Sequence, residues 1–319
     1  EQAKAALDIA EGEDVTPRED VVETTSDKTA LDKERNRNRF NFAQIGIEVG
    51  EELEFKKDKT IKAKVLENDL IIPLAAIVGF PACDRDKQLA TQINYDHVKV
   101  VCDVARENNK RVVYPNTNSG YGIGENGECT EESPLNPISH YGVTKVNAER
   151  EVLGIGGISL RLATVFGTSP RMRMDLLVNE FVYKAITDKS IVLFEKKFVR
   201  NFIHIRDVAL VFGKMIKEYP LHSGEVYNVG LSSANLTKQQ LCESIKEQIP
   251  SFEIFYNDNY QDPDKRDYIV SNHKLESMGW NPKYTLDDGI EELIKTYTIL
   301  ISNLSSNYRN DFPLGYGIK

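Results

Sequence analysis

The chain of 319 residues carries 40 basic and 49 acidic residues, and its formal charge of −9 gives no electrostatic reason to expect a nucleic acid or an anionic membrane as partner. The four cysteines form no Cys-x-x-Cys pair, the five histidines form no His-x-x-x-His pair, and no apolar run approaches the ~20 residues of a membrane helix. We therefore expect a cytoplasmic protein of two domains, or of one large α/β unit with an appendage, with reduced thiols, no metal site and no membrane span.

The first 68 residues differ from the rest in composition and in the spacing of their apolar residues. Residues 1–39 contain no aromatic residue and mix acids and bases without sustained periodicity, which predicts a largely disordered, charged tail, with a recognition tail as the alternative. From residue 40 to residue 68, short alternating apolar runs, such as Phe40 to Val49 and then Ile61, Ala63 and Val65, predict a small β-meander of unrelated origin.

A parallel sheet is predicted to begin at residue 69. Residues 69–79 form a continuous apolar run, which is typical of a strand buried on both faces. A helix follows from about Asp86 to Asn108, with apolar residues at helical spacing.

The most informative stretch is residues 109–150. A short strand over Val112 to Tyr114 runs on to Thr117, and a loop with two prolines leads into a helix that carries Tyr141 and Lys145. Residues four apart share one face of a helix, and an ammonium beside a phenol favours the ionised phenol. We predict that Tyr141 accepts a proton near neutral pH while Thr117 hydrogen-bonds the reacting oxygen, which is the chemistry of moving a hydride on or off a carbinol.

Three glycines, Gly122, Gly124 and Gly127, match the Gly-x-Gly-x-x-Gly pattern of dinucleotide-binding turns. The acidic, proline-bounded residues 128–134 come directly after them and are unsuited to open a phosphate-binding helix. We expect a flexible loop beside the active site.

The second half of the chain alternates strands and helices. Strands are predicted at 158–167, 192–198 and 202–205, and helices at 271–279 and from Asp287 to about residue 303. Asp207 and Thr237 are each predicted to cap the start of a helix.

The order of these motifs resembles the extended short-chain dehydrogenase/reductases, the NAD-dependent sugar-nucleotide epimerases and dehydratases. The likeness is nearly continuous from Asp69 to Asp288. It implies an α/β fold with a truncated Rossmann-like parallel sheet flanked by helices, and a smaller C-terminal α+β substrate domain after it. We expect a tail at 1–39, a small β module at 40–68, a partial NAD(P)-binding domain at 69–170 and a mainly nucleotide-sugar domain at 171–319.

The resemblance also implies roles for individual residues. Thr117, Tyr141 and Lys145 would be catalytic. The cofactor, NAD or NADP, would contact Leu74, Ala75, Ala76, Asn94, Tyr141 and Lys145. A nucleotide-diphosphate sugar would contact Asn118, Ser119, Thr164, Arg171, Arg173, Asn179, Arg200 and Arg266. The family commonly dimerises through the helix that carries Tyr141, so we expect a homodimer.

One difference bears on the reaction. The family's 4,6-dehydratases carry Asp-Glu directly after the catalytic threonine, as the acid and base of water elimination, whereas this chain carries Asn118 and Ser119. An amide and a hydroxyl cannot supply that acid and base, so we favour a sugar-nucleotide epimerase or ketoreductase.

The family's Gly-x-x-Gly-x-x-Gly turn is absent before residue 69, where Gly46 and Gly50 stand in the predicted β-meander. Three explanations are open: a fusion or deletion, a sequence assembled from two reading frames, or a partner chain that supplies the missing half. Because residue 1 is glutamate, we also expect an incomplete or processed chain. The alternative to an enzyme is a non-catalytic or inactive homologue that cannot bind the dinucleotide.

Overall fold

The structure, a computed structural model, describes residues 58–170, 172–257 and 266–305. The chain divides into two units, residues 1–51 and 52–319, and all the described residues belong to the second unit.

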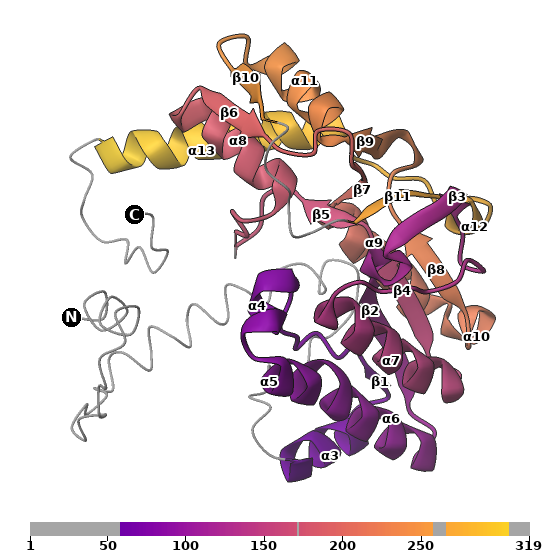
Figure 1. Cartoon of the computed structure of the whole chain (residues 1–319). Coiled ribbons are helices and arrows are strands. Elements are labelled where there is room, and N and C mark those ends of the chain that lie inside the picture. Colours follow the sequence, from indigo (N-terminus) through magenta and orange to yellow (C-terminus); the bar gives the residue numbers. More distant parts are fainter. Residues whose placement is uncertain (1–57, 171, 258–265, 306–319) are drawn as a thin grey trace, which may run out of the picture. The chain divides into compact units, whose positions relative to one another are not determined.

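The described residues form helices and strands in mixed order (Figure 1). The first half contains α3 (Asp58–Glu67), β1 (Leu70–Ile71), α4 (Phe80–Arg85), α5 (Lys87–Thr91), a π-helical segment (Gln92–Asp96), α6 (His97–Glu107), β2 (Arg111–Thr117), a 3-10 turn (Asn118–Tyr121), β3 (Ile123–Cys129), α7 (His140–Gly154), β4 (Ile158–Leu162) and β5 (Thr164–Phe166). The second half contains α8 (Leu177–Thr187), β6 (Ser190–Leu193), β7 (Val199–His204), α9 (Ile205–Lys217), α10 (Tyr219–His222), β8 (Val226–Val229), a 3-10 turn (Ser232–Ala234), β9 (Asn235–Thr237), α11 (Lys238–Gln248), β10 (Glu253–Tyr256), β11 (Asp267–Val270), α12 (His273–Glu276) and α13 (Leu286–Ser305).

Within the described residues, the largest sheet is parallel throughout, in the order β1-β2-β4-β8. Successive residues of β2 point to opposite faces, since side chains alternate along a strand. Val112 and Tyr114 pack against α3, α6 and α7, and Val113 packs with α9 and β4 on the opposite face. This sheet between two layers of helices confirms the predicted α/β fold with a parallel sheet flanked by helices (Figure 1).

The residues after β4 build a second core around α8, α11 and α13. Smaller sheets accompany it: β5-β7-β9, the parallel pair β6 and β10, and the parallel pair β3 and β11. The predicted cap is confirmed at α11, where the Thr237 hydroxyl accepts from the backbone N–H of Gln240 at 3.1 Å and the Gln240 side chain accepts from the backbone N–H of Thr237 at 2.9 Å. The predicted final helix is α13.

The β-meander prediction is wrong for residues 58–67, which form helix α3. Ile61 and Val65 lie four residues apart and are both buried against α6, whereas Ala63 between them is exposed. The apolar residues therefore follow the helical period and not the strand period. The rest of the predicted meander, and the predicted tail, lie outside the described residues.

Two predicted strands are shorter than expected. β1 ends at Ile71, and Leu74 is 65% exposed, so the prediction of a buried strand is wrong beyond Ile71. In the part of the chain that the structure describes, β1 pairs with β2 alone, and no second neighbour extends it. β6 ends at Leu193, because the chain turns at Glu195, whose φ is 49°.

Two further predictions are corrected. The glycine-rich segment is not a flexible loop, because Ile123–Cys129 forms β3 and pairs with β11. Asp207 is not the cap of α9, which His204 provides. Asp207 is buried and accepts backbone hydrogen bonds from Lys283 and Tyr284 at 2.9 and 3.1 Å, and so fastens α9 to the segment before α13.

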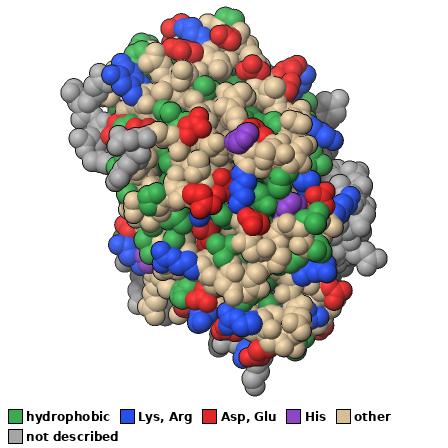
Figure 2. All heavy atoms as spheres, turned by 90° about the vertical axis from the view of Figure 1, so that its right-hand side faces the viewer, with side chains coloured by type: hydrophobic (Ala, Val, Ile, Leu, Met, Phe, Trp, Pro, Cys, Tyr) green, Lys and Arg blue, Asp and Glu red, His purple; other side chains and the backbone are tan. Residues whose placement is uncertain are grey.

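On the face shown in Figure 2, acidic and basic side chains are interspersed among small apolar areas. Among the described residues, no helix is long and apolar enough to span a membrane. The same residues contain no cluster of histidine, cysteine or carboxylate side chains that could hold a metal ion.

Candidate active site

The end of strand β2 forms one side of the site. The chain leaves β2 at Thr117 and enters a 3-10 turn, in which the Thr117 hydroxyl accepts a hydrogen bond from the backbone N–H of Ser119 at 3.1 Å. The two hydroxyls, Thr117 Oγ1 and Ser119 Oγ, are hydrogen-bonded at 3.0 Å. A threonine hydroxyl that bonds the backbone two residues ahead stabilises such a turn, so the local sequence itself fixes the Thr117 side chain.

Helix α7 brings Tyr141 to this turn. The helix starts at His140, where the Ser139 hydroxyl accepts from the backbone N–H of Gly142 at 3.1 Å. A Cβ atom on Gly142 would lie 2.8 Å from Pro137 Cβ and 3.2 Å from the backbone oxygen of Ser119. Glycine at position 142 therefore lets the first turn of α7 approach the turn after β2, and Tyr141 hydrogen-bonds Thr117 there.

The prediction that Lys145 lowers the pKa of Tyr141 towards neutrality is wrong. Burial raises the pKa of Tyr141 to about 12, because the phenolate loses water, and this outweighs the opposing effects of Arg266, of the Thr117 hydrogen bond and of Arg173. Tyr141 is therefore protonated across the neutral range, and the phenol is a proton donor before it is an acceptor.

Lys145 is buried beneath the site. Its Nζ donates to the backbone oxygen of Pro115 at 2.6 Å and lies 4.0 Å from the centre of the Tyr114 ring. Burial lowers the pKa of Lys145 from 10.5 to about 7, although Glu149 and Cys83 oppose the shift. A lysine that is only half charged near pH 7 cannot supply the full positive charge that the sequence prediction assigned to it.

This shift predicts a pH dependence of stability. Lys145 holds its proton less tightly in the folded chain than in the unfolded chain, so unfolding takes up a proton between pH 7 and 10.5, and the free energy of unfolding rises with pH in that window. From pH 7 to pH 9.5 we expect a rise of roughly 2–3 kcal/mol from this group. Urea unfolding at both pH values should show the rise in the wild type and its loss in Lys145→Met.

Lys99→Met, on the exposed side of α6, is the matched control and should keep the wild-type pH dependence. A Lys145→Met variant whose stability still rises with pH as in the wild type would contradict the assignment to Lys145.

Two arginines from distant parts of the chain reach the site. At the residue before β11, Arg266 Nη1 donates to Ser119 Oγ at 2.5 Å. Arg173, in the segment before α8, interacts electrostatically with Tyr141 and makes a two-pronged ion pair with Asp175 at 2.7 and 2.6 Å. The structure thus brings together Thr117, Asn118, Ser119, Tyr141, Lys145, Arg173 and Arg266.

Of the residues assigned to the cofactor, Asn94 contacts helix α7, where its amide donates to the Thr144 hydroxyl at 3.4 Å. Asn94, in the π-helical segment, accepts from the backbone N–H of Ile77 at 2.8 Å and donates to its carbonyl at 2.9 Å. Asn94 therefore holds the backbone that follows Ala75 and Ala76, both of which are partly buried. The thiol of Cys83 also donates to the Ile77 carbonyl, at 3.1 Å, a contact that no pattern in the sequence predicts.

The other substrate residues are not joined to Tyr141 by any contact found in the described part of the chain. Thr164 lies in β5, and the buried Asn179 uses its amide to bind the backbone of Gly167 and Arg173. Arg200 is buried in β7, donates to the Val199 carbonyl at 3.0 Å and lies 5.9 Å from the centre of the Tyr268 ring. Arg171 lies outside the described residues.

Sequence reasoning missed a buried ion pair behind the site. Glu149 on α7 accepts from Arg161 Nη2 and Nε at 2.7 and 3.0 Å, and also from Asn116 at 2.6 Å and Ser159 at 2.7 Å. Arg161 also donates to the Tyr121 hydroxyl at 2.9 Å. The spacing of Lys145 and Glu149, four residues apart on one helix, is the signal that could have placed Glu149 on the inner face of α7.

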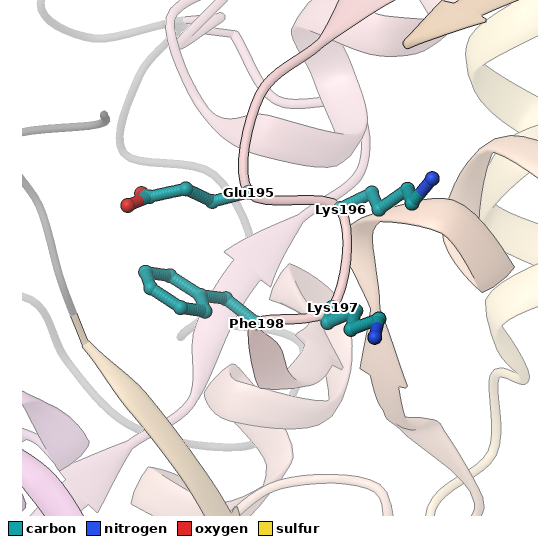
Figure 3. Close-up of a pocket in the computed structure, with 4 residues that line it drawn as sticks. All are labelled: Glu195, Lys196, Lys197 and Phe198. Carbon is teal, nitrogen blue, oxygen red and sulfur yellow. The ribbon is translucent and has the colours of Figure 1, made fainter. Parts of the chain in front are cut away.

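A cavity of about 370 Å³ lies at the loop between β6 and β7. It is lined by Glu195, Lys196, Lys197 and Phe198. Figure 3 shows the side chains of Glu195 and Phe198 extending to one side of the loop, and those of the two lysines to the other.

Comparison with known proteins identifies the family. The model of the NAD dependent epimerase/dehydratase family matches residues 18–230. The chain belongs to this family. The match starts inside the segment for which the sequence predicts a tail and an unrelated β module, and the division into domains stays a prediction.

Individual relatives are distant. The chain is 26% identical over 253 residues to the low-salt glycan biosynthesis protein Agl12 of Haloferax volcanii, covering 74% of this chain and 80% of that protein. It is similar in structure to a UDP-glucose 4-epimerase of Thermotoga maritima solved with UDP-glucose, with 18% identity, a TM-score of 0.67, and 79% and 84% of the two chains covered. It is also similar to a dTDP-glucose 4,6-dehydratase of Bacillus anthracis solved with NAD, with 22% identity, a TM-score of 0.65, and 78% and 79% covered.

Proposed function

We propose that the chain is an NAD(P)-dependent sugar-nucleotide epimerase or ketoreductase, in which Tyr141 exchanges a proton with the oxygen of a sugar carbinol. The observation that carries this proposal is the hydrogen bond between Tyr141 and Thr117, two side chains 24 residues apart that α7 and the end of β2 bring to one point. Membership of a family whose description is NAD dependent supports it, and two proteins of similar fold were solved with UDP-glucose and with NAD.

The side chains at the site have different roles in the proposed proton transfer. Thr117 orients the sugar oxygen, and Tyr141, protonated at neutral pH, donates its proton as a carbonyl becomes a carbinol. The reverse direction needs the phenolate, which the guanidinium groups of Arg266 and Arg173 favour. Asn118 and Ser119 provide no carboxylate for water elimination, which supports epimerisation or reduction over dehydration.

The nicotinamide end of the cofactor fits the residues present. Lys145 and Tyr141 would hold the nicotinamide ribose, beside the backbone that Asn94 fixes. The bound cofactor would supply or accept the hydride. For the pyrophosphate end we assign no residue, since the stretch before residue 69 contains no Gly-x-x-Gly-x-x-Gly turn.

That last observation favours a second candidate, a non-catalytic homologue that binds a nucleotide sugar but not the dinucleotide. Calorimetry of the full chain with NAD and with NADP separates the two. Micromolar binding of either dinucleotide, followed by conversion of a nucleotide sugar, is the expected result for the enzyme. Binding of a nucleotide sugar with no binding of NAD or NADP would reject the enzyme and favour the second candidate.

A further inference from the structure

One carboxylate connects the helix that carries Tyr141 to the parallel sheet. Glu149 of α7 is 2% exposed, and its oxygens accept hydrogen bonds from side chains of two paired strands. Asn116 of β2 donates at 2.6 Å, Ser159 of β4 at 2.7 Å, and Arg161 of β4 at 2.7 and 3.0 Å. Asn116 and Arg161 are partners in the register of β2 and β4, so the carboxylate fastens α7 to one point of this strand pair.

The same strand holds Lys145, one helical turn before Glu149. Lys145 Nζ donates to the backbone oxygen of Pro115 at 2.6 Å, and Pro115 directly precedes Asn116. Residues four apart share one face of a helix, so two successive turns of α7 are bound to two successive residues of β2. Glu149 therefore restricts the position of Lys145 and of the first turn of α7, which carries Tyr141.

Arg161 extends these contacts to the other side of the site. Its Nη1 donates to the Tyr121 hydroxyl at 2.9 Å. Tyr121 is the last residue of the 3-10 turn that follows Thr117. The pair formed by Glu149 and Arg161 thus contacts both segments that bring Thr117 and Tyr141 together, namely this turn and α7.

Glu149 also supplies negative charge to a lysine that is removed from water. Lys145 is 3% exposed, and Glu149 opposes the fall in the pKa of Lys145 that burial causes. From other elements, Cys83 of α4 and Tyr114 of β2 lie near Lys145, and both are uncharged near pH 7 because burial raises their pKa values. Burial also raises the pKa of Tyr141, to about 12. Glu149 is therefore the anionic partner of Lys145 near pH 7.

We propose that Glu149 is a positioning residue of the candidate active site: held between β2 and β4, its carboxylate keeps Lys145 on Pro115 and supplies the negative charge that keeps Lys145 partly protonated. The inference rests on the proposed function, in which Lys145 would hold the nicotinamide ribose. Glu149 acts through Lys145 and is assigned no contact with the sugar or the cofactor.

NMR of the full chain with ¹³C-labelled lysine tests the inference without any substrate. The Cε resonance of Lys145, assigned by its absence in Lys145→Met, should titrate near pH 7 in the wild type. In Glu149→Gln the midpoint should fall by at least about one pH unit, because the counter-charge is lost and the Arg161 guanidinium is left uncompensated. Ser159→Ala is the matched control: it removes one hydrogen bond to the same carboxylate, leaves the charge in place and should keep the wild-type midpoint.

A second variant covers the case in which Glu149→Gln does not fold. Glu149→Met combined with Arg161→Met needs no counter-charge and should stay folded. Its Lys145 midpoint should also lie below the wild-type midpoint, since the carboxylate that acts on Lys145 is gone.

The pH dependence of kcat provides a readout that a merely structural role would not move. If the charged lysine holds the ribose, kcat falls as Lys145 loses its proton. The pH at which kcat falls should therefore move down in the Glu149 variants, by the same amount as the NMR midpoint.

Two results would overturn the inference. One is a Lys145 midpoint that keeps its wild-type value in both Glu149 variants, which would leave the carboxylate a structural group. The other is a lowered midpoint with an unmoved pH dependence of kcat. A wild-type chain that converts no nucleotide sugar is a failure of the proposed function, and the NMR midpoints then decide the inference separately.

Discussion

Tyr141→Phe should lower kcat for the nucleotide sugar that the chain binds by about 10²–10⁴-fold, the range typical of a lost general acid or base. The phenol is hydrogen-bonded to Thr117, and no other group at the site combines a transferable proton with this position. The benzene ring keeps its packing, so KM for the nucleotide sugar should stay within about threefold of the wild type. Steady-state kinetics measures kcat and KM.

The matched control is Tyr297→Phe in α13. Tyr297 is buried, its hydroxyl has no hydrogen-bond partner in the described part of the chain, and it packs against Tyr183 at 5.4 Å between ring centres, far along the chain from the site. This variant should keep the wild-type kcat. If Tyr141→Phe also kept it, Tyr141 would not be the residue that transfers the proton.

Glu149→Gln should lower the free energy of unfolding by about 3–5 kcal/mol, since removal of one partner from a buried ion pair leaves the other charge uncompensated. Here the stranded charge is the Arg161 guanidinium, and the hydrogen bonds that Asn116 and Ser159 donate to Glu149 are disturbed as well. Equilibrium unfolding in urea measures the change.

Glu151→Gln, two residues further along α7, is the control. Glu151 is partly exposed and accepts from the Tyr95 hydroxyl at 3.1 Å, so its loss should cost no more than about 1 kcal/mol. A double variant, Glu149→Met with Arg161→Met, should recover much of the stability, because apolar residues of similar size need no counter-charge. Equal stability of Glu149→Gln and Glu151→Gln would show that the buried pair contributes little.

Much of the fold follows from local signals in the sequence. The apolar run at Val112 to Tyr114, the Thr237 cap and the amphipathic final helix are each encoded within a few residues, and all were predicted correctly. Helix α3 was missed because Ile61, Ala63 and Val65 together fit the strand period, whereas Ile61 and Val65 alone fit the helix period, and only packing against α6 decides between the two.

The site was predictable in part. The sequence predicts that Tyr141 and Thr117 act at one point because both come from one strand-loop-helix segment, and the two side chains meet in the structure. The raised pKa of Tyr141 was not predicted. It is caused by burial, which depends on the whole fold and outweighs the effect of a lysine four residues away on the same helix. The contact between Arg266 and Ser119 joins residues 147 apart, and no periodicity in the sequence reports such a pair.

The 147 residues between Ser119 and Arg266 also decide the order in which the two parts of the site are made during synthesis. Ribosomes add about 5–20 residues per second and domains fold as units, so the strands β1, β2, β4 and β8, which are complete by Val229, can assemble before Arg266 has been made. A nascent chain at that stage has the Thr117 turn and Tyr141 but lacks the guanidinium that reaches Ser119. The contact between Arg266 and Ser119 is therefore completed after the residues that would carry out the proton transfer.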